Sequence, residues 1–300
     1  MIRFQRILCA VDFSQCSQHA LDEAIAIAHL YDAAITVLTV FPQAIASDPF
    51  AGLPEFQPFR LTDHHRAHLF RHLKTFAERE GAEASRMEYA VREGVDIHAE
   101  ILEAAEQIQP DLLVIGTHGR TGLQHLMLGS VAEKVLHRAS CPVLTVAQKA
   151  PDAVPAAGFR RILCGVDFSE CSVSALRYAA SIAKQSAAHL EVLSVVQLIP
   201  MYEVTGAVPL YYPGLLSELT AEIGNQLQAV VGAAAAGVDV DSLVTAGTPH
   251  REIVRIADER QVDLVVVGAH SHSAVERVLF GSTTNHVVRR VSCPVLTVRK

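Results

Sequence analysis

Short apolar runs alternate with longer amphipathic segments along the whole chain, a pattern typical of α/β proteins. In the first half, the apolar runs predict strands at residues 6–11, 35–41, 87–92, 111–116 and 142–147. The longer segments predict helices at residues 15–31, 60–80, 97–108 and 129–138. Unbroken aliphatic runs such as 112–115 are typical of strands buried on both faces of a parallel sheet. Five such strands with right-handed helical crossovers predict a doubly wound sheet, which places any ligand at the carboxyl edge.

The same pattern, with much of the same sequence, occurs a second time. The segment QRILCAVDFSQCS at 5–17 returns as RRILCGVDFSECS at 160–172, with ten of thirteen positions identical. Near the end of each half, ASCPVLTV at 139–146 returns as VSCPVLTV at 291–298, with seven of eight identical. A third match lies between these two, where residues 109–116, around the fourth predicted strand, correspond to 261–268. Three matches in the same order indicate that one α/β domain is present twice, head to tail.

Length and composition agree with two domains. The chain has 300 residues, of which 50% are hydrophobic and 19% charged, so each half can bury a core. Residues 148–158 are rich in alanine and proline and lack apolar periodicity, which predicts a linker. We therefore predict two Rossmann-like domains, at 1–148 and 159–300. Each is a five-stranded parallel sheet of strand order 3-2-1-4-5, and a pseudo-two-fold axis relates the two.

Charge and hydropathy exclude several classes of protein. The formal net charge of −7 argues against broad binding to nucleic acid or anionic lipid. No run of eighteen apolar residues occurs, and the first predicted strand begins at Arg6, which leaves no room for a signal peptide. We expect a cytoplasmic protein without a membrane partner.

The six cysteines favour a packing role over disulfides. No CxxC pair is present for zinc or redox chemistry. The cysteines occupy equivalent places in the two halves, as small buried side chains would. They are Cys9, Cys16 and Cys141, recurring as Cys164, Cys171 and Cys293.

A glycine-rich pattern follows the fourth predicted strand. It reads Gly116-Thr-His-Gly119, then nine residues, then Gly129-Ser130. Gly116 would let the backbone leave the strand without a Cβ in the way of a ligand, and Gly119 could take a positive φ. Gly129 and Ser130 open a predicted helix whose free N–H groups suit an anion, although Ser130 could instead only cap that helix. Asp12, at the end of the first strand, is placed for ribose hydroxyls across the point where the strand order reverses.

These motifs, with a Val-Asp strand end and a closing Cys-Pro-Val-Leu strand, resemble the universal stress protein family over nearly all of both halves. The resemblance implies a stress-response role and an ATP site, with Mg²⁺ or a similar ion bridging the phosphates. It also implies pairing of domains through the last strands, here 142–147 against 294–299, and a homodimer is a further option. The nucleotide-binding residues it implies are Asp12, Val40, Gly116, Gly119, Gly129, Ser130 and Val131.

The second half carries a degenerate form of the motif. It reads Gly268-Ala-His-Ser271, nine residues, then Gly281-Ser282, so that Ser271 replaces the middle glycine. If that turn needs a positive φ, a Cβ there costs about 1 kcal/mol, or several-fold in affinity. We predict a weaker second site, which could be empty. Its residues would be Asp167, Val195, Gly268, Gly281 and Ser282.

Several histidines have more than one interpretation. His118 and His270 follow the fourth strand of each half and could contact a phosphate or stabilise a turn. His64, His65, His68 and His72 cluster on the second predicted helix, where a surface or packing role is favoured over a metal site. Two long aromatic loops, 41–59 and 196–212, could cover a ligand, bind a partner or only pack on the surface.

Three classes of function remain open. The first is an ATP-responsive regulatory or binding module, the second a slow ATPase or self-phosphorylating enzyme, and the third a scaffold without nucleotide. The chain lacks the HIGH, KMSKS and SGGxDS signatures and a lysine within the glycine motif. No second carboxylate accompanies Asp12 to hold a metal or activate water. We therefore predict no catalytic residues and favour the binding module, with weak ATPase activity at most.

Overall fold

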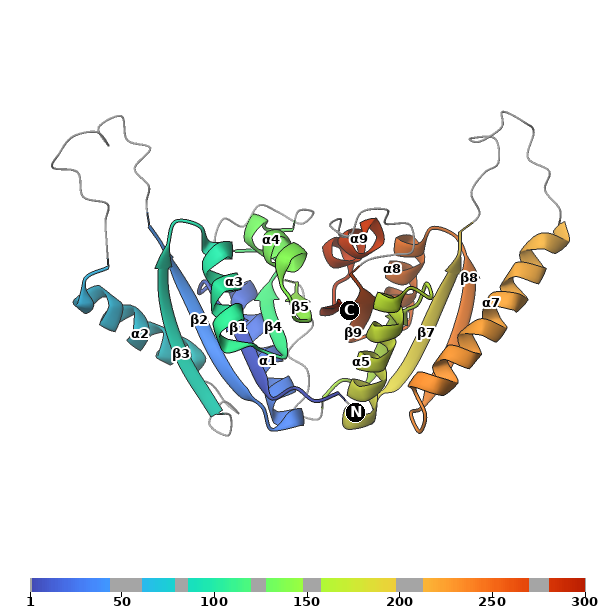
Figure 1. Ribbon diagram of the computed structural model, residues 1–300, viewed down its shortest axis with the longest axis horizontal. Helices are drawn as coiled ribbons and strands as arrows, with labels where there is room; N and C mark the ends of the chain where they lie inside the picture. The colour runs from blue at the N-terminus through green and yellow to red at the C-terminus, as the bar shows by residue number, and fades with distance from the viewer. Residues whose placement is uncertain are drawn as a thin grey trace, which may run out of the picture. The chain divides into compact units, whose positions relative to one another are not determined.

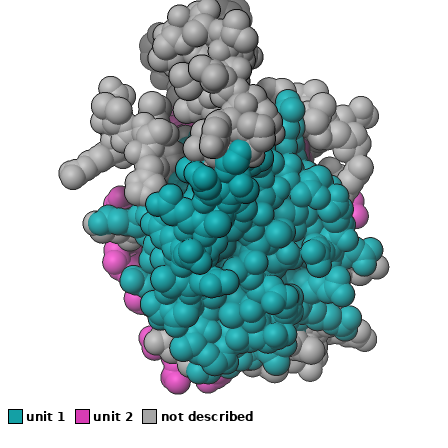
Figure 2. Space-filling view, turned by 90° about the vertical axis from the view of Figure 1, so that its right-hand side faces the viewer, with its two compact units in different colours: residues 1–2, 157–300 teal, residues 3–156 magenta. Residues whose placement is uncertain are grey.

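The computed structural model describes residues 2–43, 61–78, 86–119, 128–147, 158–197, 213–269 and 281–299. The chain divides into two compact units, which Figure 2 shows in different colours. We call Arg3–Ala156 the N-terminal unit, and Ala157–Lys300 together with Met1–Ile2 the C-terminal unit. The long aromatic loops lie almost entirely outside the described residues.

The N-terminal unit is a five-stranded parallel sheet of order β3-β2-β1-β4-β5, as predicted. Its strands fall within two residues of the predicted ones, whereas the second helix is shorter than the predicted 60–80. Its elements are β1 (Arg6–Ala10), α1 (Gln15–Tyr31), β2 (Ala34–Pro42), α2 (Asp63–Ala77), β3 (Arg86–Gly94), α3 (Ile97–Ile108), β4 (Leu112–Gly116), α4 (Ser130–Arg138) and β5 (Val143–Val146).

The C-terminal unit repeats this arrangement with strand order β8-β7-β6-β9-β10. Its helix α7 is longer than its counterpart α2. Its elements are β6 (Arg161–Gly165), α5 (Glu170–Ser186), β7 (His189–Val196), α7 (Pro213–Ala234), β8 (Val240–Ala246), α8 (Pro249–Glu259), β9 (Leu264–Gly268), α9 (Ser282–Arg290) and β10 (Val295–Val298).

Strand order determines which helices cover each face of a sheet. In the N-terminal unit the chain moves from β1 outward to β3, so right-handed crossovers place α1 and α2 on one face. It then returns to β4 and β5, which places α3 and α4 together on the other face (Figure 1). The chain therefore leaves β1 and β4, which are neighbours in the sheet, toward opposite faces. A crevice at the carboxyl ends of these two strands follows from that divergence.

The central strands form the core of each unit. Ile7 and Leu8 of β1 are fully buried, as are Leu113 and Val114 of β4. Burying one such side chain stabilises the fold by about 1.5–3 kcal/mol. Both faces of these strands are covered by helices, which explains the unbroken aliphatic runs in the sequence.

An aspartate joins the amino ends of two strands in each unit. Asp111 accepts hydrogen bonds from the backbone N–H groups of Gln5 (2.8 Å) and Arg6 (2.9 Å). In the C-terminal unit, Asp263 accepts from Arg160 (2.8 Å) and Arg161 (3.1 Å). The repeat of this contact makes it part of the fold.

The cysteines Cys9 and Cys164 should resist alkylation in the native protein at about pH 8. Both are fully buried, and burial raises the pKa of each thiol, reinforced for Cys9 by nearby Asp22. A raised pKa keeps the neutral thiol dominant at this pH, and only the thiolate reacts. Iodoacetamide labelling read by peptide mass spectrometry tests this, with half-buried Cys141 and Cys171 as internal controls. Labelling of Cys9 at the rate of Cys141 would contradict the expectation, and unfolding in guanidinium should expose all six.

None of the helices in the described part of the chain is both long enough and apolar enough to cross a membrane.

Candidate functional site

A cavity of about 170 Å³ opens at the carboxyl edge of the N-terminal sheet, where β1 and β4 end. It is the crevice that the strand order predicts. The residues that line it come from five separate stretches of the chain, and they include all seven that the sequence singled out for a nucleotide: Asp12, Val40, Gly116, Gly119, Gly129, Ser130 and Val131.

Asp12 lies in a sharp turn between β1 and α1. Its Oδ1 accepts hydrogen bonds from the backbone N–H (3.0 Å) and the hydroxyl (2.6 Å) of Ser14, which is the N-cap of α1. Phe13 between them has φ = 64°, a left-handed conformation that is uncommon for a bulky residue. Asp167, Phe168 (φ = 65°) and Ser169 repeat this turn in the C-terminal unit. The turn therefore holds the aspartate in one orientation at the mouth of each cavity.

Val40 offers backbone groups to the cavity. The last bond between β1 and β2 joins the N–H of Val11 to the carbonyl of Leu38. In a strand, the backbone groups two residues further on point to the same side. The N–H and carbonyl of Val40 therefore point past the end of β1, toward the cavity that Val40 lines. A planar ligand could form hydrogen bonds with them there.

The N-terminus of α4 is open to an anion. Its N-cap is Gly129, which has no side chain to satisfy the first N–H groups of the helix. The N–H of Gly129 itself donates to the carbonyl of Thr117 (2.7 Å). Ser130 is the first helical residue, so the alternative that it only caps the helix is wrong. The N–H groups of residues 130–132 and the positive end of the helix dipole remain for a ligand.

The two other glycines are required by close contacts, and the expected reason for Gly119 was wrong. Gly119 does not adopt a positive φ; instead, a Cβ at this position would lie 2.7 Å from Oδ2 of Asp12. A Cβ on Gly116 would lie 2.9 Å from Sγ and 3.1 Å from backbone atoms of Cys16 in α1. Gly116 thus admits the first turn of α1, in addition to keeping a Cβ away from a ligand.

Three apolar side chains that were not predicted as lining residues also line the cavity, together with His118, for which a phosphate contact was one of two interpretations. Leu38 of β2 and the α3 residues Ile97 and Ile101 form a hydrophobic wall. His118 lines the cavity, with its Nδ1 2.9 Å from Oγ1 of Thr117. Its Nε2 is buried and has no hydrogen-bond partner among the described residues. The one sequence feature that could have indicated this wall is the position of Ile97 at the start of a predicted helix, next to the carboxyl edge of the sheet.

The C-terminal unit has a corresponding cavity of about 290 Å³. Two of its lining residues are smaller than their counterparts, since Gly165 and Val267 stand where the N-terminal unit has Ala10 and Ile115. Ser271, the reason for predicting a weaker site, lies outside the described residues. The lining includes the five residues predicted for a second site: Asp167, Val195, Gly268, Gly281 and Ser282.

Two of the α2 histidines make specific contacts. His72 stacks on Phe13 with the ring centroids 4.4 Å apart, and His65 Nδ1 lies 3.0 Å from the hydroxyl of Thr62, the N-cap. His72 thereby supports the turn that carries Asp12. Within the described ranges, no three His, Cys, Asp or Glu side chains are grouped to hold a metal ion.

Comparison with known proteins agrees with this architecture. A universal stress protein of Methanocaldococcus jannaschii is 35% identical over 154 residues, which are 48% of this chain and 82% of that protein. One of Mycobacterium tuberculosis is 28% identical over 193 residues, covering 64% of this chain and 63% of that protein. The crystal structure of a universal stress protein from Archaeoglobus fulgidus shares the fold, with a TM-score of 0.66, 23% identity and 99% of both chains covered. The model of the Universal stress protein family matches twice, over residues 3–147 and 158–299. The chain belongs to the universal stress protein family, with two copies of the family's domain in tandem.

Proposed function

We propose that this protein is a cytoplasmic ATP-binding module of the stress response, whose main nucleotide site is the cavity of the N-terminal unit. The proposal rests on the fact that three groups suited to a nucleotide meet in one cavity. A carboxylate, a pair of open backbone groups and an uncapped helix N-terminus come from separate stretches of chain and line one cavity. Each has an ordinary structural explanation alone, whereas together they match the parts of a nucleotide.

The parts of ATP would be bound by different groups. The N–H groups at the start of α4 would bind phosphate oxygens, and the hydroxyl of Ser130 could add a hydrogen bond. Asp12 would accept hydrogen bonds from ribose hydroxyls. The backbone of Val40 would pair with the adenine edge, while Ile97 and Ile101 would cover its face.

A Mg²⁺ ion would be held mainly by the nucleotide. Mg²⁺ commonly keeps several waters and binds substrate phosphates with only one or two carboxylates from the protein. Asp12 is the one acidic side chain that lines the cavity among the described residues. We therefore expect Mg²⁺ to strengthen ATP binding by bridging phosphates.

A binding module is favoured over an enzyme. Phosphate binding without groups that stabilise a transition state gives little rate acceleration. Asp12 and His118 are the side chains in this cavity that could act as a general base, and one oxygen of Asp12 is already bonded to Ser14. We propose slow ATP turnover at most. Self-phosphorylation and a nucleotide-free scaffold are the alternatives.

The C-terminal cavity is proposed as a weaker nucleotide site. Its larger volume does not by itself favour ATP, because affinity follows well-placed polar contacts more than size. The replacement of the middle glycine by Ser271 in the sequence is the reason to expect weaker binding. Pairing of the two domains through their last strands, or of two chains in a homodimer, belongs to the same proposal.

The purified protein should release ATP when it is denatured, and mass spectrometry of the released nucleotide tests this. Replacing Asp12 by alanine should weaken ATP binding about tenfold or more, because a hydrogen bond to a charged group is lost. Asp167→Ala, the matched change in the other unit, should have the smaller effect. ADP production followed over hours should be slow or absent, and turnover abolished by Asp12→Ala would favour the enzyme instead. Absence of nucleotide and of calorimetric binding would favour the scaffold.

A further inference from the structure

A different kind of cavity, of about 370 Å³, lies at the amino edge of the C-terminal sheet. It is formed where β6 and β7 begin and α8 ends. Glu191, near the start of β7, lines it, whereas Val195 on the same strand lines the carboxyl-edge cavity. Four residues of strand separate these two by about 13 Å. The amino-edge cavity is therefore distinct from the proposed nucleotide site.

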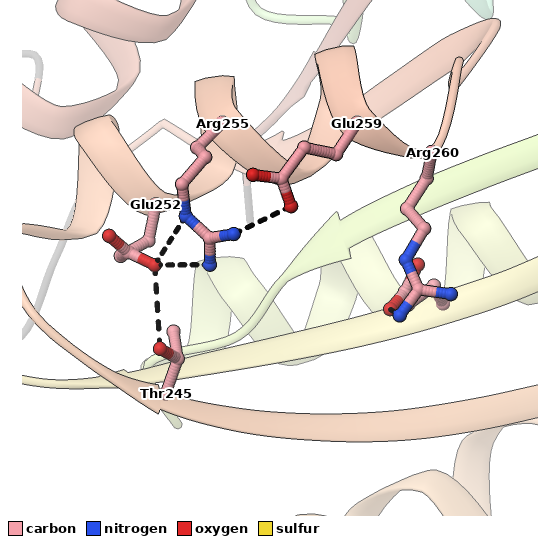
Figure 3. Close-up of polar contacts among 6 residues, drawn as sticks. Thr245, Glu252, Arg255, Glu259 and Arg260 are labelled. Atoms are coloured by element: carbon pink, nitrogen blue, oxygen red, sulfur yellow. Dashed lines mark hydrogen bonds and ion pairs between the residues drawn. The ribbon is translucent and has the colours of Figure 1, made fainter.

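Glu191 is a largely buried residue whose carboxylate accepts no hydrogen bond from the described part of the chain. The residue is 8% exposed, and no described residue donates to it. Its nearest cation is Arg260, whose Nη2 lies 3.9 Å from Oε1, beyond hydrogen-bonding distance. Figure 3 shows Arg260 beyond the end of the ion-pair network of Glu252, Arg255 and Glu259, with its side chain over β7. Because the carboxylate lines the cavity and accepts no hydrogen bond from a described residue, its oxygens are available to a ligand or water that donates one.

Three arginines line the cavity together with this carboxylate, and Arg160 has no hydrogen bond or ion pair from its side chain to the described residues. Nη1 of Arg161 donates to the carbonyl of Arg260 (2.7 Å), which leaves its other N–H groups. The neighbouring acidic groups are already engaged. Asp263 accepts the two backbone N–H groups described above, and Asp239 (3.0 Å) and Asp241 (3.5 Å) face the two ring nitrogens of His189. The lining thus includes three guanidinium groups and one carboxylate, and the Asp263 carboxylate lies close enough to Arg160 to interact with its charge.

The N-terminal unit shows that the fold does not need these charges. Strand register aligns Arg6 and Ala34 with Arg161 and His189. At the positions equivalent to Arg160, His189, Glu191 and Arg260, the N-terminal unit has Gln5, Ala34, Thr36 and Ile108. Only Arg6, equivalent to Arg161, is kept, and it makes the same bond, to the carbonyl of Ile108 (2.9 Å). Four ionisable residues thus stand in one copy of the fold where the other copy has uncharged ones.

We propose that the amino-edge cavity binds a small phosphate monoester that carries a hydroxyl group. The phosphate is bound by the guanidinium groups of Arg160, Arg161 and Arg260, which favour phosphate geometry. The hydroxyl donates a hydrogen bond to Glu191. This inference does not depend on ATP binding at the carboxyl edge.

Calorimetric titration of the full chain with glycerol 3-phosphate and with inorganic phosphate tests the proposal. Glycerol 3-phosphate should bind more tightly than inorganic phosphate. Arg260→Ile, which installs the residue of the N-terminal unit, should weaken its binding about tenfold or more. Arg255→Ala removes the same charge from the same helix outside the cavity and should leave binding unchanged. Glu191→Thr, again the residue of the other unit, should remove the preference for the hydroxylated ester.

Three results would overturn the proposal. One is the absence of binding at concentrations up to about 10 mM. Another is equal loss in Arg255→Ala and Arg260→Ile, which would indicate a diffuse charge effect. The third is a preference for glycerol 3-phosphate that survives Glu191→Thr. Circular dichroism of each variant checks that the fold is kept. We expect it to be kept, because the N-terminal unit has the same fold with threonine and isoleucine at these two positions.

Discussion

Replacing Gly268 by alanine should destabilise the C-terminal unit by about 3 kcal/mol, at the upper end of the range for overpacked cores. A Cβ at this position would lie 2.8 Å from the backbone carbon of Cys171 and from the backbone nitrogen of Ser172. Backbone atoms cannot rotate away as a side chain can, so the first turn of α5 must move off β9. Gly116→Ala should be milder in the N-terminal unit, because its shortest contact is to the Sγ of Cys16 (2.9 Å).

Hydrogen exchange followed by mass spectrometry suits this test, because a chain of two units need not unfold in one step. Peptides from 158–299 should lose protection in Gly268→Ala, while those from 3–147 should not. Gly232→Ala is the matched control. Gly232 lies inside α7 with no atom within 4 Å of a built Cβ, so alanine there should stabilise the helix by about 0.5–1 kcal/mol. Unchanged protection in Gly268→Ala would show that α5 can shift at no cost.

The sheet could be predicted from sequence because its physical cause is local. A strand buried on both faces needs an unbroken aliphatic run, and β4 (Leu112–Gly116) was predicted to within one residue from such a run. The strand order of each unit then follows from the few topologies that right-handed crossovers allow. The helix α2 was predicted too long at both ends, since its start is set by the cap Thr62 and few of its residues are buried.

The members of the candidate site were also predictable, but the reasons for some of them were not. The sequence marks Gly119 as special without saying whether a positive φ or a close neighbour requires it. That neighbour is Asp12, more than a hundred residues earlier, and only the folded chain brings the two together. The hydrophobic wall of Ile97 and Ile101 was missed for a related reason. Apolar residues at the start of a helix look the same whether they face a core or a ligand.

The left-handed Phe13 is a further feature without a sequence signal. Glycine or asparagine would mark such a turn, whereas phenylalanine is among the least expected residues for it. In the structure, contacts with His72 and Phe76 of α2 hold the ring. A histidine that could have been interpreted as a metal ligand thus supports the orientation of Asp12.

Gly119→Ser should weaken ATP binding at the proposed N-terminal site about tenfold or more. The change adds a Cβ 2.7 Å from Oδ2 of Asp12, which is closer than non-bonded atoms approach. Asp12 cannot yield freely, because its Oδ1 is bonded to the N–H and hydroxyl of Ser14. The carboxylate must therefore turn from its position or accept a hydrogen bond from the new serine, and either outcome removes an acceptor from the nucleotide. Calorimetric titration of the full chain with Mg²⁺ and ATP measures the loss.

Two companion variants separate the causes of that loss. Gly119→Ala adds the same Cβ without a hydroxyl, so an equal effect identifies the steric contact, and a smaller one identifies capture of Asp12 by the serine. Ser271→Gly makes the reverse change at the equivalent position of the C-terminal unit and should strengthen the second site if the two turns share this geometry. ATP binding at full affinity in Gly119→Ser would contradict the role given to Asp12, since the clash at 2.7 Å would then have been relieved without affecting the ligand. Such a result would also remove the reason for ranking the N-terminal site above its counterpart, because the glycine-to-serine difference is what distinguishes them.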